Sequence, residues 1–207
     1  MSSDFWRRVR RAFAAIALSW LAASPTLAET YVGAGVGVLV PYEGGTGWTL
    51  MGEIGTDWTN KWVRVGAEFV FSNLDQGADL TSVGLPPVEV RLRTYELNFV
   101  TRYVMFPGRI SPYLGVGGGF IFIDVDDGKL KQALGVPPIF QSGSTTGIGG
   151  GLLGLVGLEI PLFSKSMNLF AEARVDYYWE FTSNLKPLID EKNYNGFSGI
   201  GGLRMRF

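Results

Sequence analysis

The chain has 207 residues, a formal net charge of −1, 46% hydrophobic residues, no cysteine and no histidine. The near-neutral charge argues against nucleic-acid binding, which normally needs a basic surface, and the lack of cysteine excludes a disulfide framework. The 29 glycines follow no triplet repeat, so collagen is excluded, and the hydrophobic content excludes a disordered chain.

The first 28 residues have the pattern of an export signal. Four arginines between positions 7 and 11 precede an apolar stretch over residues 12–23, and a small residue, Ala28, ends the segment. The stretch is shorter than the ~20 residues that span a bilayer. A short membrane anchor or an N-terminal core helix are the alternatives. We predict a signal peptide over residues 1–28 and one folded domain over residues 29–207.

Removal of the signal changes the charge balance of the chain. Taking its four arginines from the 18 basic residues and Asp4 from the 19 acidic residues leaves 14 against 18, a net charge of −4. The remaining domain is therefore acidic, which again argues against nucleic acid as a partner.

The domain shows alternation of apolar with polar or small residues, which is the period of a β-strand. The clearest strand covers residues 167–181, where Leu169 and Ala173 share one face and Glu172 and Arg174 share the other. Two glycine-rich strands are apolar on both faces, so their facing is ambiguous. In chain order, the expected strands are residues 30–38, 48–58, 62–71, 90–104, 111–124, 145–160, 167–181 and 194–207.

The connections between the expected strands alternate in length. Long polar segments over residues 72–89, 125–144 and 182–193 alternate with short turns such as 59–61 and 105–110. Outer-membrane barrels have an even number of strands, short periplasmic turns and longer external loops. No later segment is long and apolar enough for a transmembrane helix. The sequence therefore predicts an all-β, eight-stranded antiparallel up-and-down transmembrane β-barrel.

Charged residues lie mostly on the strand faces opposite the apolar residues. If the apolar faces meet lipid, the charges point into the barrel, where acids and bases can pair and fill a narrow interior. A narrow or gated ion path is the functional alternative. The expected interior charge network comprises Glu53, Asp57, Arg64, Glu68, Glu96, Arg102, Glu159, Glu172, Arg174, Asp176, Arg204 and Arg206.

Aromatic residues gather near the ends of the expected strands. Trp48 and Trp58 share one face ten positions apart, which is about 25 Å of height for a strand tilted by about 40°. This spacing is typical of the two aromatic girdles at membrane surfaces, although aromatic residues are also common in strands generally. The expected girdle residues are Trp48, Trp58, Trp62, Tyr103, Tyr177 and Trp179.

The last strand ends G-I-G-G-L-R-M-R-F, with Leu203, Met205 and Phe207 on one face. This ending, the signal and the rhythm of strands and loops resemble the small outer-membrane β-barrel proteins, the OmpA-like and Opa-like eight-stranded barrels. The resemblance implies a monomer in the bacterial outer membrane, in contact with its lipid. It also implies that the barrel-assembly machinery reads Leu203, Met205 and Phe207 as a C-terminal signal.

The sequence offers little support for catalysis. Without histidine, a Ser-His pair is impossible, and no phosphate-binding or dinucleotide-binding fingerprint appears in its required setting. We expect no enzyme activity, cofactor or metal. We expect a structural or surface-interaction role through the long external loops, with a surface ligand as partner. The alternatives are a small gated pore for ions or small solutes and a soluble lipocalin-like carrier.

Overall fold

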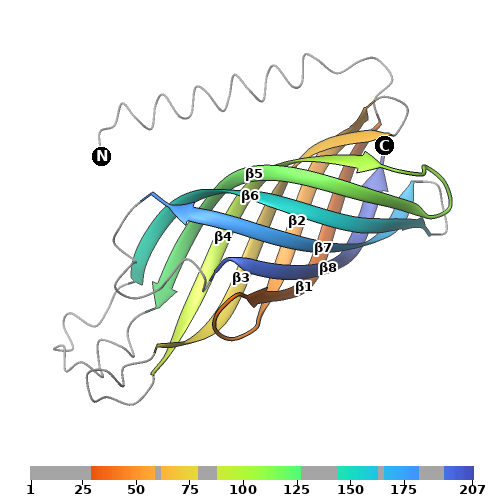
Figure 1. Cartoon of the computed structure of the whole chain (residues 1–207). Helices are drawn as coiled ribbons and strands as arrows, with labels where there is room; N and C mark the ends of the chain where they lie inside the picture. Colours follow the sequence, from red (N-terminus) through yellow and green to blue (C-terminus); the bar gives the residue numbers. More distant parts are fainter. Residues whose placement is uncertain (1–28, 59–61, 79–87, 127–143, 163–165, 182–193) are drawn as a thin grey trace, which may run out of the picture.

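The computed structural model describes residues 29–58, 62–78, 88–126, 144–162, 166–181 and 194–207. Each strand pairs antiparallel with its neighbours in sequence, and β1 pairs with β8, so the sheet closes into a barrel (Figure 1). The predicted all-β, eight-stranded up-and-down barrel is confirmed. Within the described ranges, no helix is long and apolar enough to cross a membrane. The strands are β1 (Thr30–Pro41), β2 (Gly47–Trp58), β3 (Val63–Ala78), β4 (Val88–Val104), β5 (Ser111–Asp126), β6 (Ser144–Pro161), β7 (Met167–Glu180) and β8 (Gly196–Arg206).

The first and last strands close the barrel along their whole length. Their pairing runs from Tyr31 opposite Arg206 to Pro41 opposite Gly196. Beyond β8, the amide of Phe207 donates a hydrogen bond of 2.8 Å to the carbonyl of Thr30. Closure leaves the sheet without an unpaired edge. It also puts the start of β1 and the end of β8 at the end of the barrel that carries the short connections.

Four strands extend at least two residues further than the alternation predicted, all at the end with the long connections. β1 continues to Pro41 instead of ending at residue 38, β3 continues to Ala78 instead of ending at residue 71, β4 begins at Val88, and β5 ends at Asp126. The predicted connection over residues 72–89 is therefore partly strand. Figure 1 shows β3 and β4 projecting beyond the other strands at this end of the barrel. We refer to it as the outer end.

Along most of their length, the strands place apolar residues outside and polar residues inside. Val36, Val116 and Leu152 are strongly exposed on the outer face, whereas Glu172 and Arg174 are buried. A lipocalin-like carrier would have the opposite arrangement, with its apolar face inside and its charges in water. The outer face is therefore suited to lipid contact.

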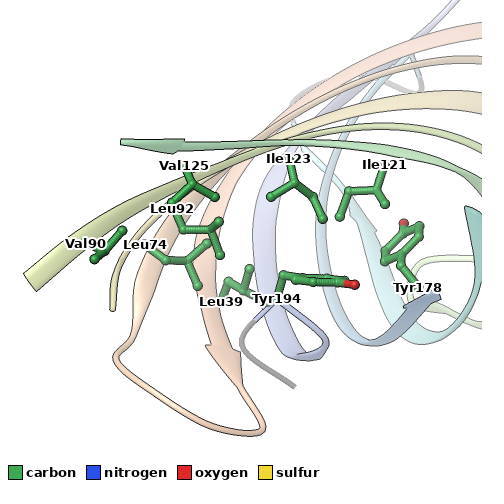
Figure 2. Close-up of a cluster of buried hydrophobic side chains, with 9 residues drawn as sticks. All are labelled: Leu39, Leu74, Val90, Leu92, Ile121, Ile123, Val125, Tyr178 and Tyr194. Atoms are coloured by element: carbon green, nitrogen blue, oxygen red, sulfur yellow. The ribbon is translucent and has the colours of Figure 1, made fainter. Parts of the chain in front are cut away.

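At the outer end this polarity reverses within single strands. In β4, Glu96 faces inward and Tyr95 outward, but past Thr94 it is Leu92 that faces inward and Arg93 that faces outward. The inward residues form a buried apolar cluster (Figure 2), here called the outer apolar cluster. It comprises Leu39, Leu74, Val90, Leu92, Ile121, Ile123, Val125, Tyr178 and Tyr194. This reversal explains why the predicted strands were too short. A pattern that requires one face to stay apolar stops at the point where the inward and outward faces exchange polarity.

Candidate functional site

The barrel interior brings together the twelve charged residues of the expected network. They come from six of the eight strands, β2, β3, β4, β6, β7 and β8, because every second residue of a strand faces inward. Eleven of them are buried, and the side chain of Arg206 is only 12% exposed. We keep the name interior charge network for this set, which contains five arginines and seven carboxylates.

Arg102 of β4 lies at the centre of the network. Its Nη2 atom is 3.0 Å from Glu53 Oε2 and 3.0 Å from Glu172 Oε1, and it also contacts Glu68. The Nε atom of Arg102 donates a hydrogen bond to Glu172 at 3.1 Å. One guanidinium therefore contacts carboxylates from three other strands, β2, β3 and β7. Glu53 and Glu68 lie directly opposite each other in the β2–β3 ladder, so their like charges depend on this shared cation.

Arg204 of β8 is the second fully buried arginine at this level. Its Nε atom donates to Glu53 at 2.6 Å, and its Nη1 atom donates to Glu159 at 2.7 Å. Its guanidinium also lies over aromatic rings, 4.7 Å from the ring centroid of Phe170 and 5.2 Å from that of Tyr31. Cation–π contacts add to the ion pairs when the cation is desolvated. Arg204 thus links the closing strand β8 to β2 and β6.

Toward the short connections, a second group of ion pairs fills the interior. Arg64 and Asp57 face each other across the β2–β3 ladder, with 3.0 Å between Arg64 Nε and Asp57 Oδ1. Arg206 reaches Asp57 at 3.1 Å and Glu159 at 2.5 Å, and Arg64 also contacts Glu159. Each carboxylate here is shared by at least two arginines.

Toward the outer end, the network becomes acidic and ends beneath the outer apolar cluster. Arg174 pairs with Glu68 at 2.9 Å and lies 3.8 Å from Asp176. Glu96 is held by neutral groups: Tyr178 donates to it at 2.9 Å and Asn98 at 3.2 Å. Since Tyr178 comes from β7 and Glu96 from β4, this contact crosses the interior.

Buried tyrosines, which the alternation of charged and apolar residues did not predict, complete the network. Tyr113 donates to Glu172 at 2.8 Å, and Arg102 donates to Tyr31 at 3.4 Å. Glycine makes room for these rings: a Cβ atom at Gly157 would lie 2.3 Å from the Tyr113 ring. Glycines follow Tyr31 and Tyr113 at every second position, on the same face of each strand. A large ring on a face that otherwise carries glycine is the signal that could have placed these rings inside.

The other predicted residues lie on the outer surface. Leu203, Met205 and Phe207 all face outward from the last strand and are exposed. The rings of Trp62 and Tyr103 lie together near the short connections, with centroids 6.2 Å apart. All six expected girdle residues are exposed: Trp48, Trp58, Trp62, Tyr103, Tyr177 and Trp179. Their roles in membrane anchoring and assembly remain predictions.

The interior is built for structure more than for reaction chemistry. Guanidinium groups do not release protons at neutral pH, and most of the carboxylates are engaged by arginines. Among the described residues, no group of three or more acidic, histidine or cysteine side chains is placed to hold a metal ion. The arrangement can stabilise the barrel and block its interior.

Comparisons with known proteins identify the family. Residues 12–207 match the profile of the outer membrane protein beta-barrel domain. No curated protein matches the sequence significantly. A major outer membrane protein from Thermus thermophilus has a similar structure, with a TM-score of 0.51 and 18% identity over 87% of this chain and 100% of that one.

Two further solved structures are similar at lower scores. Neisserial surface protein A has a TM-score of 0.49 and 14% identity, covering 87% of this chain and 96% of that one. The attachment invasion locus protein of Yersinia pestis, solved with the heparin analogue sucrose octasulfate, has a TM-score of 0.47 and 11% identity, covering 87% and 97%. Because the family profile spans nearly the whole sequence, this chain belongs to the outer membrane protein β-barrel domain family and is a protein of the bacterial outer membrane.

Proposed function

We propose that this protein is a closed outer-membrane scaffold that displays its extracellular segments for contact with ligands at the cell surface. The observation that carries the proposal is the filled interior. The interior charge network occupies the barrel from the short connections to Tyr178, and the outer apolar cluster continues from Tyr178 to the outer end. The family is one of outer-membrane barrels, which agrees with a role without catalysis.

The filled interior favours a scaffold over a pore. An eight-stranded barrel has an interior just wide enough for side chains, and here arginines from β3, β4, β7 and β8 reach across it to carboxylates on other strands. An ion would have to separate several buried pairs to pass, and each separation leaves a charge uncompensated. The filled interior thus favours a rigid, closed barrel over a barrel that conducts ions.

The strand ends that border the segments proposed to contact ligands lie at the outer end. In barrels of this class the short turns face the periplasm, so the outer end faces the cell exterior. The expected binding segments 72–89 and 125–144 are shortened by the strands, and residues 79–87, 127–143 and 182–193 lie outside the described residues. Loops on a rigid scaffold are common recognition elements. The proposed signal over residues 1–28 also lies outside the described residues.

Replacing residues 79–87, 127–143 and 182–193 with two-residue turns tests the surface role. We expect cells carrying the native barrel to bind at least one member of a glycan array or a set of immobilised matrix proteins, and cells carrying the variant to lose that binding. A heat-dependent shift in gel migration verifies that the variant is folded. Binding that persists in the folded variant would contradict the surface role.

The intact mass of the native protein checks the proposed cleavage of the signal, which should leave Glu29 as the first residue.

Recordings in planar bilayers test the closed interior. We expect the purified native barrel to show no stable conductance steps over a wide range of voltage, because the ion pairs of Arg102 and Arg204 bridge the interior. Stable steps from folded protein would contradict the closed scaffold and support the alternative, a small gated pore.

A further inference from the structure

Glu96 of β4 differs from the other carboxylates of the interior charge network in having neutral partners. Among the described residues, the arginines form ion pairs with every other carboxylate of the network but not with Glu96. Glu96 Oε2 lies 2.9 Å from the hydroxyl oxygen of Tyr178 and 3.2 Å from Nδ2 of Asn98. The Tyr178 hydroxyl is also 3.0 Å from Asn98 Oδ1. The side chains of Glu96, Asn98 and Tyr178 therefore form a closed ring of contacts, here called the outer polar ring.

The outer polar ring has three contacts, and each of them needs one hydrogen atom, because two acceptor atoms this close repel each other. Tyr178 has one hydroxyl hydrogen, so it can donate to Glu96 or to Asn98 but not to both. The amide nitrogen of Asn98 faces only one of its two neighbours, whichever way the amide is turned. Tyr178 and Asn98 thus supply two of the three hydrogens. The third must come from Glu96, whose carboxyl group is a donor only when it is protonated.

The burial of Glu96 and the charges around it agree with a neutral carboxyl group. Glu96 is 5% exposed, and an ionised carboxylate without a cation is costly at such a site. On β7, the charges of Asp176 and Arg174 act on it. Arg174 already pairs with Glu68 of β3 at 2.9 Å and lies 3.8 Å from Asp176. An ionised Glu96 would therefore be a third carboxylate around one guanidinium.

Glycines make room for the outer polar ring, and Asn195 of the segment before β8 holds it in place. A Cβ atom at Gly119 of β5 would lie 2.3 Å from Asn98 Oδ1, and one at Gly151 of β6 would lie 2.3 Å from the Tyr178 ring. These two positions thus bring no titratable group to the ring. The side chain of Asn195 accepts a hydrogen bond from the backbone amide of Tyr178 at 2.6 Å and donates one to its carbonyl at 2.8 Å.

The outer polar ring joins opposite parts of the barrel wall. It links β4 to β7 across the interior, and Tyr178 belongs both to the ring and to the outer apolar cluster (Figure 2). We infer that Glu96 carries a proton in the folded barrel and that the outer polar ring is a pH-sensitive latch, which holds β4 to β7 beneath the outer apolar cluster and weakens when this proton is lost.

The latch makes the stability of the barrel fall as the pH rises. In the unfolded chain, a glutamate side chain loses its proton near pH ~4.3. Above this pH, the folded barrel binds a proton that the unfolded chain has released, so stability declines until Glu96 ionises in the folded barrel as well. In a Glu96→Gln variant the amide supplies hydrogen atoms at every pH, so this part of the decline should be absent.

Urea unfolding titrations of the barrel in phospholipid vesicles, at about pH 6 and about pH 9, measure this decline. We expect the urea midpoint of the native barrel to fall between the two pH values relative to that of Glu96→Gln. Asp75→Asn removes a carboxylate at the outer end whose side chain is 70% exposed, and it should retain the native decline. An equal pH response of the native barrel and the folded Glu96→Gln variant would overturn the inference.

Infrared spectroscopy locates the proton without reference to stability. In a detergent that has no carbonyl groups, the native barrel should show the carbonyl stretch of a protonated carboxyl group at about pH 6 and lose it at about pH 9. The band should be absent from Glu96→Gln and present in Asp176→Asn, and the heat-dependent gel shift confirms folding of each variant. A native spectrum without the band at the lower pH, or a band that persists in folded Glu96→Gln, would place no proton on Glu96 and end the proposal.

Discussion

Replacing Arg102 with methionine is expected to lower the free energy of unfolding by about 3–5 kcal/mol, because it leaves buried carboxylates without their shared cation. Glu53, Glu68 and Glu172 all lie within ion-pair distance of its Nη2 atom, and every one of these side chains is at most 1% exposed. The measurement is a urea unfolding titration of the barrel in phospholipid vesicles, followed by tryptophan fluorescence.

A second variant distinguishes charge from packing in this result. Adding Glu68→Gln to Arg102→Met removes a buried carboxylate charge that then has only Arg174 as its ion-pair partner, so the double variant should recover part of the lost stability, and the two changes should be non-additive. Arg109→Gln, which alters an exposed arginine, should change stability by less than about 0.5 kcal/mol. A loss of less than about 1 kcal/mol for Arg102→Met would show that the network does not hold the barrel together.

Placing arginine at Val36 is expected to cost about 2–4 kcal/mol, whereas arginine at Val40 of the same strand should cost about 0–1 kcal/mol. Both valines face outward from β1, with exposed fractions of 64% and 45%. Val36 lies near the middle of β1 and Val40 near its outer end, about 10 Å apart in height for a tilted strand. The same vesicle titration measures both variants.

The comparison of these two valines tests the lipid contact directly. In water, an exposed valine at either position could become arginine at little cost, since surface substitutions are usually within about 0.5 kcal/mol of neutral. In lipid, the cost depends on depth because the hydrocarbon core offers a cation no hydrogen bonds. Equal, small effects at Val36 and Val40 would contradict a lipid-facing outer surface.

The alternation of side chains along single strands was enough to predict much of this protein. The opposite faces of Leu169 and Glu172 identified β7, and the rhythm of long and short connections predicted a closed barrel with eight strands. The set of charged residues that faces inward also followed from alternation alone, because a strand has only two faces. These features depend on the order of neighbouring residues and on the lengths of the connections, and both are read directly from the sequence.

The pairing of the charges was decided only by the tertiary structure. Arg102 meets Glu53, Glu68 and Glu172 because barrel closure brings β2, β3, β4 and β7 around one narrow space. The separation of these residues in sequence gives no hint of which acid faces which base. The space for the inward rings of Tyr31 and Tyr113 also depends on barrel closure, since it is made by glycines on neighbouring strands.

The extent of the strands at the outer end also required the structure. Leu74 and Leu92 face inward where the membrane-level part of the same strands places charges, while Arg91 and Arg93 face outward. A change of surroundings from lipid to water outside the barrel makes outward charges favourable, and the inward leucines then supply the apolar packing. The sequence by itself determined which residues share a face; the closed barrel and its position in the membrane decided whether that face meets lipid, water or other side chains.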